Sequence, residues 1–141
     1  MKAPWHLWLI GIVALIWNGF GAADYVMTQY DYTPYTAQFT DAQRTYFNSF
    51  PSWVQAAWAL AVWLSVAGSL ALLLRSRLAA VFFGLSLVSM AFSFTHNFFL
   101  ADVTMPDVVG PEAIWFTIVI IVVAVLLWAY ARRMRVVGVL E

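Results

Sequence analysis

The sequence has no cysteine, only two histidines and few charged residues. The absence of cysteine excludes disulfide bonds, thiolate metal sites and thiol catalysis. The two histidines, His6 and His96, are too few for most haem or multi-histidine metal centres, and we expect no cofactor. Charged residues make up 10% of the chain, whereas a soluble domain carries about 25%. A water-facing globule would lack a polar coat, so the lipid bilayer is the expected solvent.

Apolar residues instead make up 64% of the chain and give it a mean hydropathy of +0.82. A helix needs about 20 mainly apolar residues to cross the roughly 30 Å of hydrocarbon in a bilayer. Four segments meet this requirement, and they cover about residues 5–27, 53–74, 78–100 and 113–131. They lack the alternation of period two that is typical of barrel strands. We therefore predict an all-α fold with one domain, residues 1–141, built as a four-transmembrane-helix bundle.

The seven basic and seven acidic residues cancel in number, which argues against nucleic-acid binding by counterion release. They are nevertheless separated along the chain. Basic residues favour cytoplasmic loops, and six of the seven lie on one side of the predicted spans: Lys2, Arg75, Arg77, Arg132, Arg133 and Arg135. The other side holds Arg44 and six of the seven acids: Asp24, Asp31, Asp41, Asp102, Asp107 and Glu112. The pattern predicts that the N-terminus and the C-terminus are both cytoplasmic.

The first span also has features of a signal peptide. Lys2 precedes an apolar run, Leu7 to Trp17, and the small residues Gly21, Ala22 and Ala23 follow it. We expect this segment to be retained as a signal-anchor helix.

The loop between the first and second predicted spans, residues 28–52, is long and aromatic. Thr40 followed by Gln43 fits a capping box that begins a short helix, which Pro51 would end. Tyr46, Phe47 and Phe50 would lie on one side of this helix. We therefore predict a short amphipathic helix in the outer membrane interface.

A polar stripe runs along the third predicted span. Its members recur every three or four residues, which places them on one helical face: Ser86, Ser89, Ser93, His96 and Asn97. Ser65 and Ser69 form a shorter stripe on the second span. Small and hydroxylated residues let membrane helices approach closely and form hydrogen bonds, so helix packing is the simpler explanation for the serines. A solute pathway is the alternative.

A second polar group is expected within about two turns of the outer boundary, and it comprises Asn18, Asp24, Gln55, His96 and Asn97. Ionisable groups at membrane depth are costly and often functional. His96 can exchange protons near neutral pH, and Asp24 is its expected partner. The pair would form a proton relay or bind a cation or small polar solute. Alternatively, both are ordinary solvated residues at helix ends.

Ser93 and Trp17 complete the predicted ligand or proton site. Trp17 precedes Asn18 and two glycines, Gly19 and Gly21, so its ring could stack on a sugar or quinone-like ligand, or simply pack. One histidine with scattered carboxylates has no metal-ligand spacing. No nucleophile accompanies the acid and the histidine, and we assign no catalytic residue.

The fourth predicted span is almost entirely branched aliphatic between Ile118 and Leu127, so it is expected to face lipid or an apolar partner. The tail that follows, Arg132 to Glu141, is basic and then apolar. We expect the tail to lie on the inner membrane surface, attracted by anionic lipid.

Four short runs resemble a known group of proteins: Trp5–Trp8, Trp17–Ala22, Phe50–Trp53 and Val137–Leu140. The chain is similar in these runs to small bacterial four-span inner-membrane proteins, some of which carry the label "sugar transporter". The resemblance implies a multi-pass protein of the bacterial inner (plasma) membrane.

Three functions are compatible with the sequence. The first is a small accessory, assembly or ligand-binding membrane protein that forms a homo-oligomer or joins a larger membrane complex. It ranks first because no charged residue lies near the membrane centre, where coupled transporters commonly carry one. The alternative is a small-solute transporter whose pathway forms between copies in a homo-oligomer. The third is a membrane enzyme that uses the outer aspartate and histidine, although enzymatic activity is not expected.

Overall fold

The computed structural model describes residues 2–141, and every regular element in this range is helical. The long helices are α1 (Trp5–Gln29), α4 (Ser52–Leu73), α5 (Leu78–Thr95) and α7 (Glu112–Val136). A π-helical turn, η1 (His96–Leu100), continues α5. Four helices, with η1 counted as part of α5, are long and apolar enough to cross a membrane. The prediction of an all-α protein with four candidate spans is confirmed.

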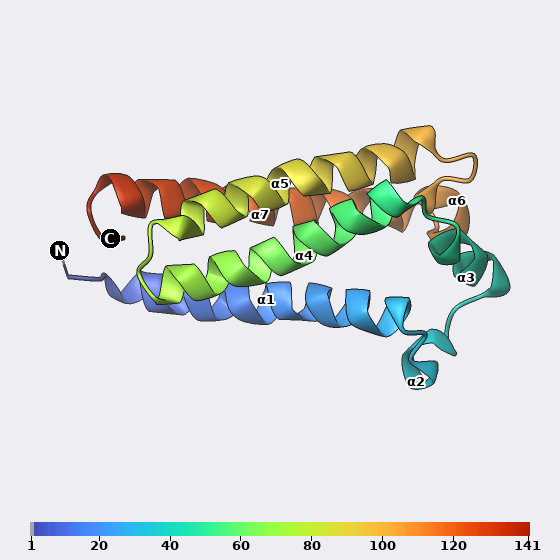
Figure 1. The fold of residues 1–141 in the computed structure, drawn as a ribbon, viewed down its shortest axis with the longest axis horizontal. Coiled ribbons are helices and arrows are strands. Elements are labelled where there is room, and N and C mark those ends of the chain that lie inside the picture. The colour runs from blue at the N-terminus through green and yellow to red at the C-terminus, as the bar shows by residue number, and fades with distance from the viewer. Residues whose placement is uncertain (1) are drawn as a thin grey trace.

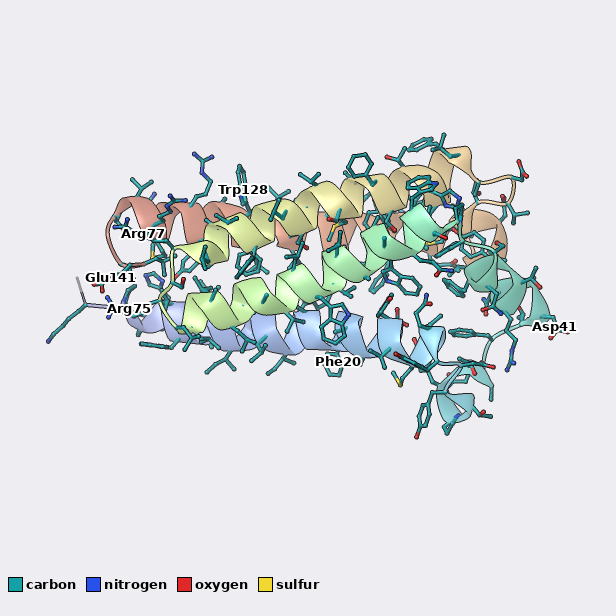
Figure 2. All side chains as sticks on the ribbon, in the orientation of Figure 1. Phe20, Asp41, Arg75, Arg77, Trp128 and Glu141 are labelled. Carbon is teal, nitrogen blue, oxygen red and sulfur yellow. The ribbon has the colours of Figure 1, made fainter. Side chains whose placement is uncertain are left out.

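The long helices lie side by side, and the described ends of the chain lie at the same end of the bundle (Figure 1). Helix α4 packs against both α1 and α5, and α7 packs against α5. Three short helices lie at the opposite end, namely α2 (Thr33–Thr36), α3 (Asp41–Asn48) and α6 (Met105–Val109). We call this the loop end. Figure 2 shows Arg75, Arg77 and Glu141 at the other end, which we call the basic end.

Helices α1 and α7 are longer than the apolar segments that predicted them. Helix α1 continues to Gln29, and α7 continues past Ala131 to Val136. The extension of α7 includes Arg133 and Arg135 in its last turn. Arginine is a good helix former, and its positive charge is favourable at a helix C-terminus. The ends of the apolar segments therefore do not mark the ends of the helices.

Small residues allow the helices to approach closely. A Cβ atom added at Gly68 of α4 would lie 2.7 Å from the ring of Phe83 in α5. A Cβ atom added at Gly11 of α1 would lie 2.5 Å from a side-chain carbon of Leu73 in α4. Lipid tails are as apolar as the side chains, so close packing replaces the hydrophobic effect as the force between membrane helices. The two glycines mark where this packing is tightest.

The tail after α7 turns back into the bundle instead of lying entirely on its surface. Gly138 has a φ of 81°, a left-handed conformation that favours glycine. The reversal buries Val139 and Leu140, which are 2% and 0% exposed, in the core at the basic end. The backbone N–H of Glu141 donates to the carbonyl oxygen of Arg75 at 2.8 Å. Only part of the tail therefore matches the expectation of a surface segment.

In the loop between α1 and α4, Thr40 precedes α3 and forms the capping box. The Thr40 hydroxyl accepts from the Gln43 backbone N–H, and the Gln43 side chain accepts from the Thr40 N–H, both at 3.1 Å. The helix ends at Asn48, three residues before Pro51.

Gly68→Ala tests the close packing of α4 and α5. We expect it to lower the free energy of unfolding by about 1–3 kcal/mol, because the buried Phe83 ring would have to shift. Gly19→Ala is the control, because nothing lies within 4 Å of a Cβ atom added at Gly19. Equilibrium unfolding in mixed micelles measures both variants. Equal stability of the two would contradict this description of the α4–α5 contact.

Candidate functional site

Asn18 joins α1 to α4 near the middle of the bundle. Its Nδ2 donates to the Ser69 hydroxyl at 2.9 Å and to the Ser65 carbonyl oxygen at 3.3 Å. The Ser69 hydroxyl in turn donates to the Ser65 carbonyl at 2.9 Å. Because α1 extends to Gln29, Asn18 lies about three turns from the end of its helix. The structure therefore places Asn18 deeper than the sequence indicated and separates it from the loop end.

Two serines of the third span, Ser86 and Ser89, form hydrogen bonds with backbone carbonyl groups. The Ser86 hydroxyl is buried and donates to the Ala61 carbonyl of α4 at 2.6 Å, which joins α4 to α5. The Ser89 hydroxyl donates to the Leu85 carbonyl of its own helix at 2.9 Å. Ser93 is buried. The Ser86 bond supports the packing explanation for that part of the stripe.

A small cavity lies beside these contacts. It has a volume of about 20 Å³, and its lining includes Trp17, Asn18, Ser65 and Ser86. A cavity of this size has room for about one water molecule. Trp17 and Asn18 thus line the same cavity, but the cavity is too small to hold a sugar or a quinone.

Asp24 accepts a hydrogen bond from the Tyr35 hydroxyl, which ties α2 to the end of α1. Burial of Tyr35, its hydrogen bond to Asp24 and the charge of that carboxylate together raise the pKa of the phenol. Across residues 2–141, no salt bridge connects Asp24 with His96. The loop path brings Tyr35 to the carboxylate instead, so the predicted pairing of Asp24 with His96 is not formed in this structure.

His96 and Asn97 lie on the π-helical turn η1. His96 Nδ1 is 3.2 Å from Asn97 Oδ1, and Asn97 is only 3% exposed. The His96 ring makes edge contacts with Phe50 at 5.8 Å and with Trp53 at 5.6 Å between centroids. Gln55 lies close by, because its Nε2 donates to the Phe50 carbonyl at 3.2 Å. His96 and Gln55 therefore both contact Phe50, and Asn97 contacts His96 in a type of turn that occurs frequently at functional sites.

An aromatic cluster covers this region at the loop end. We call it the aromatic cap, and it consists of Phe39, Tyr46, Phe47, Phe50, Trp53 and Trp58. The Phe47 and Trp58 rings are stacked at 6.2 Å, and the Tyr46 and Phe50 rings meet edge to face at 5.1 Å. Tyr25 of α1 also meets Trp58, at 5.0 Å. The cap joins α3 to α1, α4 and η1.

Tyr46 is a residue of this region that the sequence did not single out as a site. Its hydroxyl is buried and has no hydrogen-bond partner within residues 2–141, and the residue is 5% exposed. Burial raises the pKa of Tyr46 to about 12. The Thr40–Gln43 capping box is the sequence feature from which the position of Tyr46 could have been predicted, because it determines where α3 begins and therefore on which face Tyr46 lies. An unpaired buried hydroxyl costs stability.

Among residues 2–141, no group of three histidine or acidic side chains is arranged to hold a metal ion. The candidate site is thus a polar pair, His96 and Asn97, beneath aromatic rings, together with a separate Asn18–Ser69 contact in the middle of the bundle.

Tyr46→Phe tests the state of the buried hydroxyl. At neutral pH we expect the free energy of unfolding to stay the same or to rise by up to about 1 kcal/mol, because no hydrogen bond is lost. The raised pKa of Tyr46 means that the folded state holds this proton more tightly than the unfolded state does. This group's contribution to the free energy of unfolding is fully present below the unfolded pKa of about 10 and is lost as the pH rises through the folded pKa of about 12.

The free energy of unfolding should therefore fall less between pH 7 and pH 11 for Tyr46→Phe than for the wild type. Tyr30→Phe, at an exposed position, serves as the control and should behave like the wild type. A variant that is clearly less stable at neutral pH would show that the Tyr46 hydroxyl has a partner.

The chain matches no protein-family model, and neither a curated protein nor a solved structure is significantly similar to it. The function must therefore be argued from the geometry of the bundle itself.

Proposed function

We propose that this chain is a small accessory or assembly protein of the bacterial inner membrane, with both termini in the cytoplasm. One observation carries the proposal. The deep polar side chains Asn18, Ser69 and Ser86 form contacts between helices around a cavity of only about 20 Å³. A single copy has no space there for a solute, and its polar groups serve to join the helices.

The surface of α7 supports an assembly role. Its buried residues form one narrow stripe: Ala113, Thr117, Leu127, Ala131 and Met134. Exposed apolar residues occupy much of the remaining surface, among them Ile114, Ile118, Val119, Val122 and Val125. In a bilayer such a face contacts either lipid or the helix of a partner. The proposal assigns part of it to a partner, which is a second copy or a larger membrane protein.

The other two functions receive less support from the geometry. A transporter would need a pathway between copies, because the space inside one bundle is too small. A hydrolytic or isomerising enzyme would need the acid and the base close together, whereas Asp24 binds Tyr35 and His96 contacts Asn97.

The absence of cysteine allows a clean test of the orientation. We expect a cysteine introduced as Ser76→Cys, between α4 and α5, to be protected from a membrane-impermeant maleimide in intact spheroplasts. A cysteine introduced as Asp41→Cys, at the loop end, should be labelled. Both should be labelled after the membrane is permeabilised, which controls for burial. The reverse pattern would place the termini outside the cytoplasm.

Native mass spectrometry of protein extracted from its own membranes tests the assembly role. We expect a stoichiometric complex that Ile118→Trp combined with Val122→Trp dissociates, because both side chains are exposed on α7. Ile12→Trp combined with Ile16→Trp, at exposed positions of α1, is the matched control. A monomer in the wild type would refute the proposal. Solute flux in proteoliposomes, with a homo-oligomer present, would favour the transporter instead.

A further inference from the structure

An apolar groove lies along the surface between α1 and α7 at the basic end of the bundle. Its volume is about 530 Å³, and its lining includes Ile10 of α1 and Val123, Leu126 and Leu127 of α7. This volume is within the range of about 300–1,000 Å³ that is usual for small-molecule sites. The groove lies between two membrane-spanning helices, so its occupant must have an apolar part.

Two polar side chains border the groove, Tyr130 and Arg133. The Tyr130 hydroxyl is already engaged, because it lies 2.6 Å from His6 Nδ1 on α1. Within residues 2–141, no acidic side chain pairs with Arg133. Arg133 is therefore the group in the groove that can bind an anion.

The length of the groove matches one leaflet of a bilayer. The rise along α7 from Val123 to Arg133 is about 15 Å at 1.5 Å per residue. This is about half of the roughly 30 Å of hydrocarbon in a bilayer. The groove thus begins at the charged boundary, where a headgroup lies, and ends near the bilayer centre, where an acyl chain ends.

The charge of the basic end determines which headgroup fits. Arg75 and Arg77 lie there, together with the last turns of α7, which carry Arg132, Arg133 and Arg135, and with Lys2 just before α1. Within residues 2–141, the acidic side chain at this end is that of Glu141. Glu141 lies 3.7 Å from Arg75 and so offsets a charge away from Arg133. The positive excess is complementary to an anionic lipid.

We propose that this groove binds one acyl chain of an anionic phospholipid, whose phosphate is held by Arg133. The site goes beyond the assembly role, because its occupant is a lipid and it needs no protein partner.

Arg133→Gln tests the headgroup contact, and Arg132→Gln is the matched control. The Arg132 guanidinium carbon lies 4.9 Å from the centre of the Trp128 ring, so this neighbouring positive charge faces elsewhere. Purified protein in detergent is titrated with phosphatidylglycerol or with phosphatidylcholine of the same acyl chains, and bound lipid is counted by native mass spectrometry. We expect one tightly retained phosphatidylglycerol, about fivefold weaker binding in Arg133→Gln, and wild-type binding in Arg132→Gln.

Ala129→Trp tests the acyl-chain contact, because Ala129 is the smallest side chain in the lining and a bulky ring would fill the groove. Val88→Trp, at an exposed position of α5 outside the lining, is the control for added bulk. We expect only Ala129→Trp to lose the lipid. Inorganic phosphate should not compete, because it lacks the apolar part.

Several results would overturn the proposal. They are equal retention of the two lipids, unchanged binding in Arg133→Gln, displacement of the lipid by inorganic phosphate alone, and a lipid-free dimer that Ala129→Trp dissociates. The last result would show that a second copy occupies the groove.

Discussion

The close approach of α4 to α5 holds the bundle together. Helix α4 contacts both α1 and α5, and α7 reaches the rest mainly through α5. Gly68 leaves room for the Phe83 ring, and the Ser86 hydroxyl reaches the Ala61 carbonyl at 2.6 Å. In lipid such contacts carry the association of helices, because no hydrophobic force draws one apolar helix to another. Apart from this contact, the α1–α4 pair and the α5–α7 pair meet at the basic end, where His6 lies against Tyr130, and at the loop end, where His96 lies against Phe50 and the Gln43 side chain donates to the Val108 carbonyl.

The aromatic cap plays a comparable part at the loop end by a different kind of contact. Rings from α3 meet rings from α4, and His96 lies at the edge of the cluster. Aromatic pairs add a preferred geometry to the area they bury. The loop of residues 30–51 is thus held by specific contacts, and the polar pair His96 and Asn97 lies beneath them.

Long apolar segments were the strongest signal in the sequence, because few structures other than a membrane helix accommodate about 20 such residues. The exact helix ends were not predictable from hydropathy, since Arg133 and Arg135 are polar and still helical. The deep Asn18 contact was partly foreseeable, because a polar residue in a span tends to find a polar group on a neighbouring helix. The orientation of the termini rests on the charge pattern alone and stays a prediction.

The pairing of Asp24 with Tyr35 could not be predicted from the sequence, because it depends on the path of an irregular loop. Such a loop has no periodic pattern of apolar residues from which its path could be inferred. The π-helical turn at His96–Leu100 contains no glycine or proline from which it could have been predicted. By contrast, the capping box at Thr40 was readable, since it depends on two residues at a fixed spacing. Local geometry was therefore predictable where few neighbouring residues determine it.

The contacts of α1 also have a mechanical consequence. Asn18 holds the middle of this helix to α4, and Asp24, almost two turns further on, holds Tyr35 of the loop. Tyr35 meets Phe39, and Phe39 meets Phe47 of the aromatic cap. Helix α1 is thus connected to the aromatic cap through the loop as well as to α4 through Asn18. A displacement of the loop-end half of α1 would therefore move Tyr35 and, through Phe39 and Phe47, would disturb the packing of the aromatic cap.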